Sequence, residues 1–266
     1  MTTIKELMSL KGRRALITGA AGGLGKIMAE TLAELGADLV LVDRPGADFG
    51  ELVKTLGQQW QVQVQVRSCD LEQAAERAEL VGWVKSGSGL NILINNAAFV
   101  GTSGLEGWAV PFEEQTVETW RRALEVNVTA AFDLCQGLMP VLKAGRGASI
   151  INVASIYGDY APDWSLYENT SMSNPAAYGV SKAGLNQLTR WLSSTVAPEV
   201  RVNAISPGGI FRNQPEAFVK RYEAKTPLGR MATEGDFRGV VAYLASDLSA
   251  YVTGQKFAVD GGWGVW

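Results

Sequence analysis

The sequence predicts an α/β fold built on a doubly wound, seven-stranded parallel sheet with helices on both faces. Short apolar, β-branched runs alternate with longer helical patterns along the whole chain, which is typical of repeated βαβ units. The length of 266 residues suits one large α/β unit, and no linker, repeat or low-complexity tract divides it. We therefore expect residues 1–266 to form a single domain.

Each strand is expected where a short apolar run lies between turn residues, and each helix where apolar residues recur at the helical period. The predicted strands cover residues 15–18, 38–42, 61–67, 91–95, 149–154, 201–206 and 257–259. The predicted helices cover residues 24–35, 72–85, 118–142, 176–196, 216–225 and 234–245. The first helix shows the pattern clearly, because its apolar face consists of Ile27, Met28, Leu32 and Leu35.

The run 61–67 differs from the other predicted strands. Val62, Val64 and Val66 alternate with glutamines, so one face of this strand is expected to contact water. Such a strand suits an edge of a sheet that is otherwise buried. In the strand order 3-2-1-4-5-6 of doubly wound folds, the third strand occupies that edge.

The chain contains no histidine, which excludes several kinds of chemistry. Without imidazole there is no Ser-His-Asp hydrolase, no Cys-His protease and no His-ligated metal. Cys69 and Cys135 are far apart and form no CxxC pair, so neither a zinc site nor a redox dithiol is expected. One remote disulfide is the most they allow, and we expect both as buried, reduced side chains.

The charge balance and the amino terminus indicate the kind of partner. The formal net charge is −3, from 24 Lys and Arg against 27 Asp and Glu, with no basic run. Neither a nucleic acid nor an anionic membrane surface is expected to bind such a chain, which leaves small molecules and further copies of itself. The first residues lack the apolar stretch of a signal peptide, and no window suits a membrane span, so a cytoplasmic location is expected.

A glycine-rich turn follows the first predicted strand, where the chain reads TGAAGGLG from Thr18 to Gly25. Glycines allow a tight turn and a close backbone approach, and the free N–H groups of a helix N-terminus attract phosphate. A P-loop is excluded, because Lys26 is followed by Ile27 instead of Ser or Thr. The turn either only closes a strand-helix corner or, as we expect, binds a dinucleotide diphosphate through Gly19, Gly23, Leu24 and Gly25.

Asp43 follows the second predicted strand, 24 residues after Gly19. A carboxylate at this place can accept hydrogen bonds from both hydroxyls of an adenosine ribose, and it repels a 2′-phosphate. It favours NAD over NADP as the cofactor, although the neighbouring Arg44 is able to pair with a phosphate. The alternative is an ordinary turn aspartate before Arg44-Pro45-Gly46.

Tyr178 and Lys182 are four positions apart on a predicted helix, so both side chains project from one face. A nearby ammonium and a positive nicotinamide ring both favour the phenolate, which lowers the pKa of the phenol toward working pH. Ser155 follows a buried strand at the edge where open parallel sheets bind ligands, and its hydroxyl can donate to a carbonyl oxygen. The alternatives are packing for Tyr178, a solvated Lys182 and a capping role for Ser155.

These residues together resemble the short-chain dehydrogenase/reductase family over essentially the whole chain. The glycine turn matches TGxxxGxG, the segment NNAA at 95–98 is similar to NNAG, and Tyr178 with Lys182 supplies YxxxK. The resemblance implies a Rossmann fold and cofactor contacts, beyond those named above, at Asp70, Leu71, Asn96, Ala97, Tyr178, Lys182 and Ile210. It also implies that Asn127 holds a water that relays protons from Lys182; the alternative is a polar residue in a helix packed on the sheet.

Two departures from the family pattern are visible in the sequence. Arg212 stands where many relatives have threonine, so only the backbone of Ile210 remains as an expected nicotinamide contact in this segment. Ser155 and Tyr178 are 23 positions apart, about twice the usual family spacing. The resulting insertion, near residues 156–175, is expected to shape the substrate pocket; a surface excursion without substrate contact is the alternative.

The insertion suggests what kind of substrate is bound. Tyr160 and Trp164 provide flat faces, and groups that can bind hydroxyls are found at Asp159, Asp163, Glu168 and Asn169. With the segment 207–222 and the carboxyl terminus, the insertion looks like the family branch associated with bacterial surface-polysaccharide and flagellin-modification sugars. The terminal Trp263 and Trp266 are expected to pack against another subunit.

The chain is thus expected to be an NAD(H)-dependent oxidoreductase that interconverts a secondary alcohol and a ketone, with Tyr178 as general acid and base. A polar, sugar-like substrate is the first expectation. One alternative is a 3-oxoacyl-(acyl-carrier-protein) reductase, which should favour NADPH; another is a nucleotide-sensing Rossmann protein without catalysis. Related enzymes commonly form tetramers through the YxxxK helix and the helix before it, so a homotetramer or dimer is expected.

Overall fold

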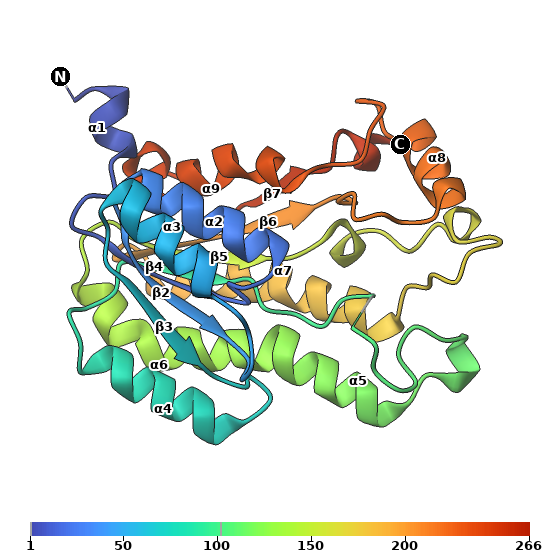
Figure 1. Ribbon diagram of the computed structural model, residues 1–266, viewed down its shortest axis with the longest axis horizontal. Helices are drawn as coiled ribbons and strands as arrows, with labels where there is room; N and C mark the ends of the chain where they lie inside the picture. Colours follow the sequence, from blue (N-terminus) through green and yellow to red (C-terminus); the bar gives the residue numbers. More distant parts are fainter. Residues whose placement is uncertain (1, 102) are drawn as a thin grey trace.

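A seven-stranded parallel sheet runs through the computed structural model, which describes residues 2–101 and 103–266 (Figure 1). The strand order is β3-β2-β1-β4-β5-β6-β7, and every neighbouring pair is parallel. The expected doubly wound fold is therefore confirmed, with the order reversing between β1 and β4. The strands are β1 (Arg14–Thr18), β2 (Asp38–Asp43), β3 (Val64–Ser68), β4 (Ile92–Asn95), β5 (Ala148–Val153), β6 (Val200–Pro207) and β7 (Lys256–Val259).

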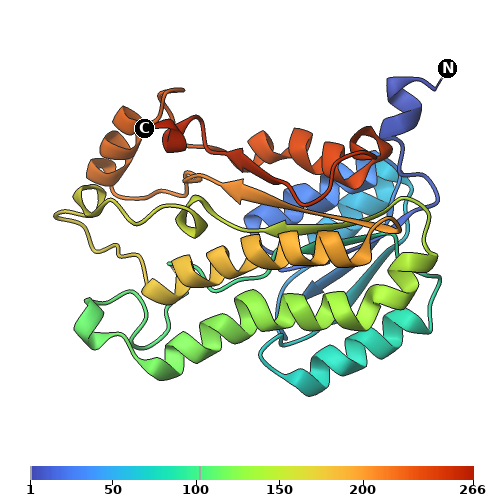
Figure 2. The same cartoon turned by 180° about the vertical axis from the view of Figure 1, so that it is seen from behind.

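Helices cover both faces of the sheet (Figures 1 and 2). One face packs against α2 (Gly23–Glu34), α3 (Gly50–Trp60) and α9 (Arg238–Ala245). The other packs against α4 (Ala74–Lys85), α6 (Ala130–Ala144) and α7 (Ala176–Val196). Alternate residues of each central strand enter the two cores: Ile17 of β1 faces α2, for example, while its neighbour Leu16 faces α4 and α6.

Two further helices, α1 (Ile4–Met8) and α8 (Glu216–Lys225), lie outside these layers, whereas α5 (Val117–Leu124) leads into α6 in the same layer and contacts α7. The strands end at the right-hand edge of the sheet in Figure 1, where α8, the start of α7 and the segment between β5 and α7 gather. Within residues 2–101 and 103–266, no helix is long and apolar enough to cross a membrane. Both cysteines are buried and free, as expected.

Two helices were not expected from the sequence, α1 and α3. The helix α3 contains Gly57 and three polar or aromatic residues at its end, which masks its period, yet Leu52 and Leu56 form a buried pair one turn apart. It continues to Trp60 and ends at Gln61, whose φ is 55°. Strand β3 therefore begins at Val64 instead of residue 61.

The edge position of β3 is confirmed, and so is its wet face. Gln65 and Arg67 are exposed, and even Val66 on the other face is 39% exposed.

The expected helix 118–142 is interrupted in the structure. It is divided by a π turn, Glu125–Thr129, which contains Asn127. Such turns often mark functional sites in helices.

Candidate active site

The glycine-rich turn joins β1 to α2 at the carboxyl edge of the sheet. Gly19 has a φ of +64°, and a Cβ on it would lie 2.8 Å from the Cα of Ala97. A Cβ on Gly25 would collide with the carbonyl oxygen of Gly19. The first and last glycines are thus required by the turn itself. The N–H groups of the first turn of α2, which includes Leu24, have no partner within the helix and are suited to bind a diphosphate.

Asp43 lies at the end of β2, beside this turn. One carboxylate oxygen accepts the N–H of Ala21 at 2.9 Å, and the other accepts the N–H of Arg44 at 2.8 Å. The carboxylate is partly buried, whereas Arg44 is exposed. These two bonds fix the carboxylate at the edge between β2 and the glycine turn, the place where an adenosine ribose is expected.

The NNAA segment is tied directly to the glycine turn. Asn96 Nδ2 donates to the carbonyl oxygens of Thr18 and Gly19 at 2.9 and 3.0 Å. The backbone N–H groups of Asn96 and Ala97 both donate to Thr18 Oγ1 at 3.1 Å. Asn96 therefore holds the turn in shape through its side chain, and Ala97 forms the wall behind it.

Asp70 and Leu71 follow β3, on the same edge of the sheet. Asp70 Oδ1 accepts the N–H of Glu72 at 3.0 Å, and the Asp70 N–H donates to Glu76 Oε2 at 2.7 Å. Leu71 is buried in the same core as Val42. Both residues lie next to the end of β2, and their contact with the cofactor stays a prediction.

Ser155, Tyr178 and Lys182 meet at the carboxyl end of β5. Ser155 is two positions after Val153, the last residue of β5, and is buried. Lys182 is only 2% exposed, its Nζ donates to the carbonyl oxygen of Val153 at 2.7 Å, and it lies 5.8 Å from the centre of the Tyr178 ring. The insertion therefore does not separate the serine from the tyrosine: α7 begins after it and returns Tyr178 to β5.

The pKa of Tyr178 differs from the sequence-based expectation. Burial raises the pKa of this phenol in the protein alone, while a hydrogen bond with Ser155 and the charge of Arg212 act in the opposite direction. The pKa of Lys182 is lowered from 10.5 to about 7, because its ammonium is buried. The phenol pKa is therefore raised in the protein alone, and its expected lowering beside a bound nicotinamide stays a prediction.

A consequence for stability follows from the buried Lys182. Between pH 7 and pH 10.5 the unfolded chain binds this proton and the folded protein does not, so stability should rise with pH. The whole shift corresponds to roughly 5 kcal/mol. We expect the difference in free energy of unfolding between wild type and Lys182→Met to move in favour of wild type over this window, and to be flat below it.

Urea unfolding of the cofactor-free protein, monitored by circular dichroism at several pH values, measures this difference. Lys85→Met, at an exposed lysine that ends α4, is the matched control and should follow the wild-type curve. A wild-type curve parallel to that of Lys182→Met across the window would contradict the lowered pKa.

Asn127 connects three parts of the site. Its Oδ1 accepts the N–H of Phe99 at 2.7 Å, and its Nδ2 donates to the Phe99 carbonyl at 3.1 Å and to Ser181 Oγ at 2.9 Å. Phe99 belongs to the segment after β4, and Ser181 precedes Lys182 on α7. Asn127 thus positions the segment after β4 against α7, with its amide almost fully buried.

Ile210 lies in the segment after β6, but its backbone is partly engaged. Its carbonyl oxygen accepts Gln214 Nε2 at 2.7 Å, and Gln214 Oε1 in turn accepts the Arg212 N–H at 2.7 Å. The residue also forms an isolated parallel bridge with Ala232. The Ile210 N–H is therefore available for the expected contact with a carboxamide, whereas the Ile210 carbonyl oxygen already accepts from Gln214.

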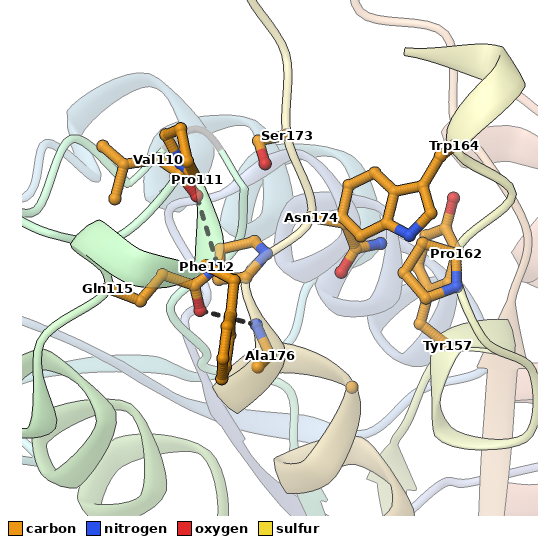
Figure 3. Close-up of a pocket in the computed structure, with 12 residues that line it drawn as sticks. Val110, Pro111, Phe112, Gln115, Tyr157, Pro162, Trp164, Ser173, Asn174 and Ala176 are labelled. Atoms are coloured by element: carbon orange, nitrogen blue, oxygen red, sulfur yellow. Dashed lines mark hydrogen bonds between the residues drawn. The ribbon is translucent and has the colours of Figure 1, made fainter.

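The insertion lines a cavity of about 350 Å³ with the segment before α5 (Figure 3). Figure 3 shows Trp164 and Pro162 on one side and Phe112 on the other, with the start of α7 beneath them. Its walls are largely apolar and aromatic, and polar groups enter at Gln115, Tyr157, Ser173 and Asn174. Tyr157 also contributes to the wall, and its ring centre lies 6.5 Å from that of Tyr178, so the cavity lies near this tyrosine.

The charged residues of the insertion mostly bind the protein itself. Asp159 pairs with Lys256 at 2.6 Å, and Asp163 pairs with Lys225 and caps the short helix that starts at Trp164. Asp159 also accepts a hydrogen bond from Asn186 at 3.3 Å. These carboxylates fix the loop to β7, α7 and α8, instead of lining the cavity.

An aromatic cluster joins the insertion to the carboxyl terminus. The Trp263 ring packs against Tyr157 and Tyr160 edge-on or tilted and stacks on Tyr222, at 5.9 to 6.5 Å between ring centres. Trp263 thus packs within the chain, and its expected contact with another subunit stays a prediction. Trp266 is 85% exposed, and its Nε1 donates to the Lys225 carbonyl at 2.9 Å.

Three residues near the site were missed from the sequence: Gln214, Tyr222 and Glu234. Tyr222 accepts the Gly209 N–H at 2.6 Å, and Glu234 reaches the glycine turn. No spacing rule connects them with the motifs, because they come from segments far apart in the chain. Tyr222 gave no distinct signal either, because its helix, α8, also contains Phe218 and Val219.

Comparisons with known proteins agree with this geometry. A family model described as Enoyl-(Acyl carrier protein) reductase matches residues 19–264. A tropinone reductase homolog of Arabidopsis thaliana is 34% identical over 97% of this chain and 92% of that protein. A 3-oxoacyl-[acyl-carrier-protein] reductase of Thermotoga maritima is 33% identical over 96% of this chain and 99% of that protein.

Solved structures give the same result. A putative NAD(P)-dependent gluconate 5-dehydrogenase from Beutenbergia cavernae, with bound NADP, superposes with a TM-score of 0.86. It is 29% identical, and the match covers 98% of this chain and 100% of that one. The chain belongs to the short-chain dehydrogenase/reductase family and is an oxidoreductase that acts on CH–OH groups with NAD(P).

Proposed function

We propose that this protein interconverts a secondary alcohol and a ketone with NAD(H), and that residues 1–266 form one dinucleotide-binding catalytic domain. The observation that carries the proposal is the meeting of Ser155, Tyr178 and Lys182 at the carboxyl edge of the sheet. The glycine-rich turn at the same edge has no room for a Cβ at Gly19 or Gly25. In open parallel sheets this edge is where ligands bind.

The residues of the turn fit a dinucleotide. Gly19 and Gly25 leave no room for a Cβ, so the backbone of the turn packs closely against the start of α2. The free N–H groups at this helix start are suited to bind a diphosphate. In the proposal Gly19, Gly23, Leu24 and Gly25 hold the diphosphate, Asp70 and Leu71 border the adenine, and Asn96, Ala97 and Ile210 border the nicotinamide half. The bound cofactor supplies or accepts the hydride.

Asp43 supports NAD over NADP. Its carboxylate is held by two backbone N–H groups, so it cannot swing away from a 2′-phosphate without losing both bonds. The Asp43 carboxylate would repel the 2′-phosphate of NADP, whereas the ribose hydroxyls of NAD can donate hydrogen bonds to it. The bound NADP in the Beutenbergia cavernae structure is a property of that protein. For this protein, the proposed preference for NAD rests on Asp43.

The proton chemistry is assigned to the chain's own residues. Tyr178 exchanges the proton of the substrate hydroxyl, and Ser155 donates a hydrogen bond to the substrate oxygen as charge develops there. Lys182 in its protonated form stabilises the phenolate and binds the ribose of the cofactor. Asn127 positions the water that passes protons between Lys182 and solvent. A nucleotide-sensing protein without catalysis would not need these four groups together.

For the substrate we propose a polar, sugar-like alcohol or ketone. Aromatic side chains pack well against the C–H faces of sugar rings, and the cavity offers Trp164 and Tyr157 together with the amides of Gln115 and Asn174. A second class, a 3-oxoacyl thioester, is favoured by a different observation. The wall formed by Val110, Pro111 and Phe112 is apolar and suits an acyl chain.

The proposed function is tested by a screen of purified protein against sugars, sugar acids, polyols and acyl thioesters, with NAD(H) and NADP(H) in parallel. Absorbance of the reduced nicotinamide reports turnover in either direction. We expect turnover of at least one polar secondary alcohol or its ketone, with higher kcat/KM for NAD(H). Turnover of acyl thioesters alone would replace the sugar-like substrate by the second class, a 3-oxoacyl thioester. No turnover in any class would contradict the proposed function.

We propose that the protein forms a homotetramer or dimer through α6 and α7. Phe132 on α6 and Val180 and Trp191 on α7 are large apolar side chains that are 41%, 49% and 55% exposed. Val180 and Trp191 are eleven positions apart, so they lie on one face of α7. Exposed apolar groups of this size on one helix face are typical of subunit contacts.

Trp191→Glu should dissociate this assembly, because it places a charge in the centre of the apolar face. Analytical ultracentrifugation of wild type and variant at equal concentration measures the result. Tyr251→Glu, at a fully exposed aromatic residue before β7, is the matched control and should keep the wild-type mass. Equal masses for wild type and Trp191→Glu would place the contact elsewhere.

A further inference from the structure

The ion pair between Arg212 and Glu234 lies against the start of α2. Arg212 Nε is 3.1 Å from Glu234 Oε1, and the two residues come from separate segments, one after β6 and one before α9. A Cβ on Gly23, the first residue of α2, would lie 2.7 Å from Glu234 Oε1 and 3.1 Å from Arg212 Nη2. Both ends of the ion pair therefore touch the surface that the proposed function gives to the diphosphate.

A second observation connects Arg212 with Tyr178, the phenol of the proposed function. Its positive charge acts on Tyr178, where it lowers the pKa of the phenol against the effect of burial. The guanidinium thus lies near both Gly23 and Tyr178. In a dinucleotide bound across this edge, the diphosphate and the nicotinamide ribose lie between those two points.

From this geometry we infer that the guanidinium of Arg212 binds the diphosphate of the cofactor. Without the cofactor, the Glu234 carboxylate binds the same guanidinium, and the diphosphate replaces this carboxylate when it binds. The inference rests on the proposed function, because it assumes a dinucleotide at the glycine turn. Arginine forms paired hydrogen bonds with phosphate, and a carboxylate is the side chain that imitates this geometry best. A carboxylate is also favourable at a helix N-terminus, where Glu234 lies beside α2.

The exchange is feasible because the pair is accessible. The side chains of Arg212 and Glu234 are 49% and 31% exposed, and exposed ion pairs contribute little to stability. When a diphosphate approaches Gly23, the Glu234 carboxylate and the phosphate cannot share the place, since like charges repel. Glu234 moves to solvent and Arg212 keeps an anionic partner throughout. No proton or covalent bond is exchanged.

Two variants change binding in opposite directions. Arg212→Thr, which introduces the residue that many relatives have here, should raise the Kd for NADH about tenfold or more, because a charge-assisted hydrogen bond to phosphate is lost. It should also flatten the dependence of Kd on salt concentration, since one ionic contact is missing. Glu234→Gln should lower the Kd about threefold, because the competing charge is removed while the shape is kept.

The experiment is a titration of each variant with NADH at low and high salt, followed by nicotinamide fluorescence in the absence of substrate. In the double variant the effect of Glu234→Gln should be smaller than in the single variant, because Glu234 no longer competes for Arg212 and only its direct repulsion of the phosphate remains. Arg146→Thr, at an exposed arginine before β5 on the opposite edge of the sheet, removes the same charge and should leave the Kd unchanged.

The outcomes separate this inference from the proposed function. A wild-type protein that binds neither NADH nor NADPH would overturn both. Normal binding by wild type, with an Arg212→Thr Kd within twofold of it, would overturn only the role of Arg212. Weaker binding by Glu234→Gln would also overturn the exchange, and a tighter Kd in this variant cannot arise from misfolding.

Discussion

Tyr178→Phe should lower kcat by about 10² to 10⁴ while the Kd for NADH stays within about twofold of wild type. The phenol oxygen is the only group of Tyr178 that can transfer a proton, and phenylalanine keeps the ring that packs edge-on against Tyr157. The substitution therefore removes the chemistry and keeps the packing. Steady-state turnover of the best substrate of the screen, with fluorescence titration of NADH, measures both quantities.

The matched control is Tyr243→Phe. This tyrosine lies on α9, where its ring packs edge-on against Phe257, and it is on the opposite face of the sheet from α7. The control loses the same hydroxyl and should retain wild-type kcat. If Tyr178→Phe kept wild-type kcat as well, another group would have to supply the proton.

Asp43→Asn should shift the cofactor preference toward NADP by tenfold or more in the ratio of kcat/KM values. The amide keeps an oxygen that can accept the Ala21 N–H, but it removes the charge that repels a 2′-phosphate. With that charge gone, the exposed Arg44 becomes able to pair with the phosphate. A hydrogen bond from a ribose hydroxyl to a charged acceptor is worth roughly 1.5–3 kcal/mol, so kcat/KM with NAD should fall at the same time.

The control for Asp43→Asn is Asp48→Asn. Asp48 is exposed, follows β2 by five positions and accepts only the N–H of Gly50 among the bonds of the described chain. Its variant has the same change in charge and should keep the wild-type preference. A wild-type enzyme that already prefers NADP would overturn the role proposed for Asp43, whatever the variants do.

The fold was largely predictable because its signals are local. The turn after β1 needs glycine at positions 19 and 25 for reasons of backbone geometry, and a glycine-rich turn between a strand and a helix is typical of doubly wound folds. The wet face of β3 identified an edge strand, which agrees with the strand order expected of a doubly wound fold. The helix α3 was missed because it has only two buried residues, Leu52 and Leu56, although Val53 and Trp60 also pack against the core.

The site was predictable where motifs fix it and not where distant segments meet. Tyr178 and Lys182 share one helix face by spacing alone, so their juxtaposition follows from the sequence. The pairing of Arg212 with Glu234 depends on how the segment after β6 approaches α2, which no local pattern records. Asp159 and Asp163 show the same limit: as residues they suit hydroxyl binding, but Lys256 and Lys225 neutralise them.

The pKa of Tyr178 shows that the composition of a site does not determine its electrostatics. A lysine four positions away is expected to lower the pKa of a phenol, yet here the lysine is itself buried, with a pKa of about 7. Burial then raises the pKa of Tyr178 in the protein alone. The burial that raises the pKa of this phenol and the charge of Arg212 that lowers it both depend on tertiary structure.

The central claim is that a hydride passes between the nicotinamide and a substrate carbon while Tyr178 handles the proton. It is tested most directly by reducing the best ketone of the screen with NADH deuterated at C4 and analysing the alcohol by mass spectrometry. We predict one deuterium on the carbinol carbon with wild type, from one of the two C4 faces only, and a rate lower by about 10² or more with Tyr178→Phe. An alcohol without deuterium from either face would contradict the claim.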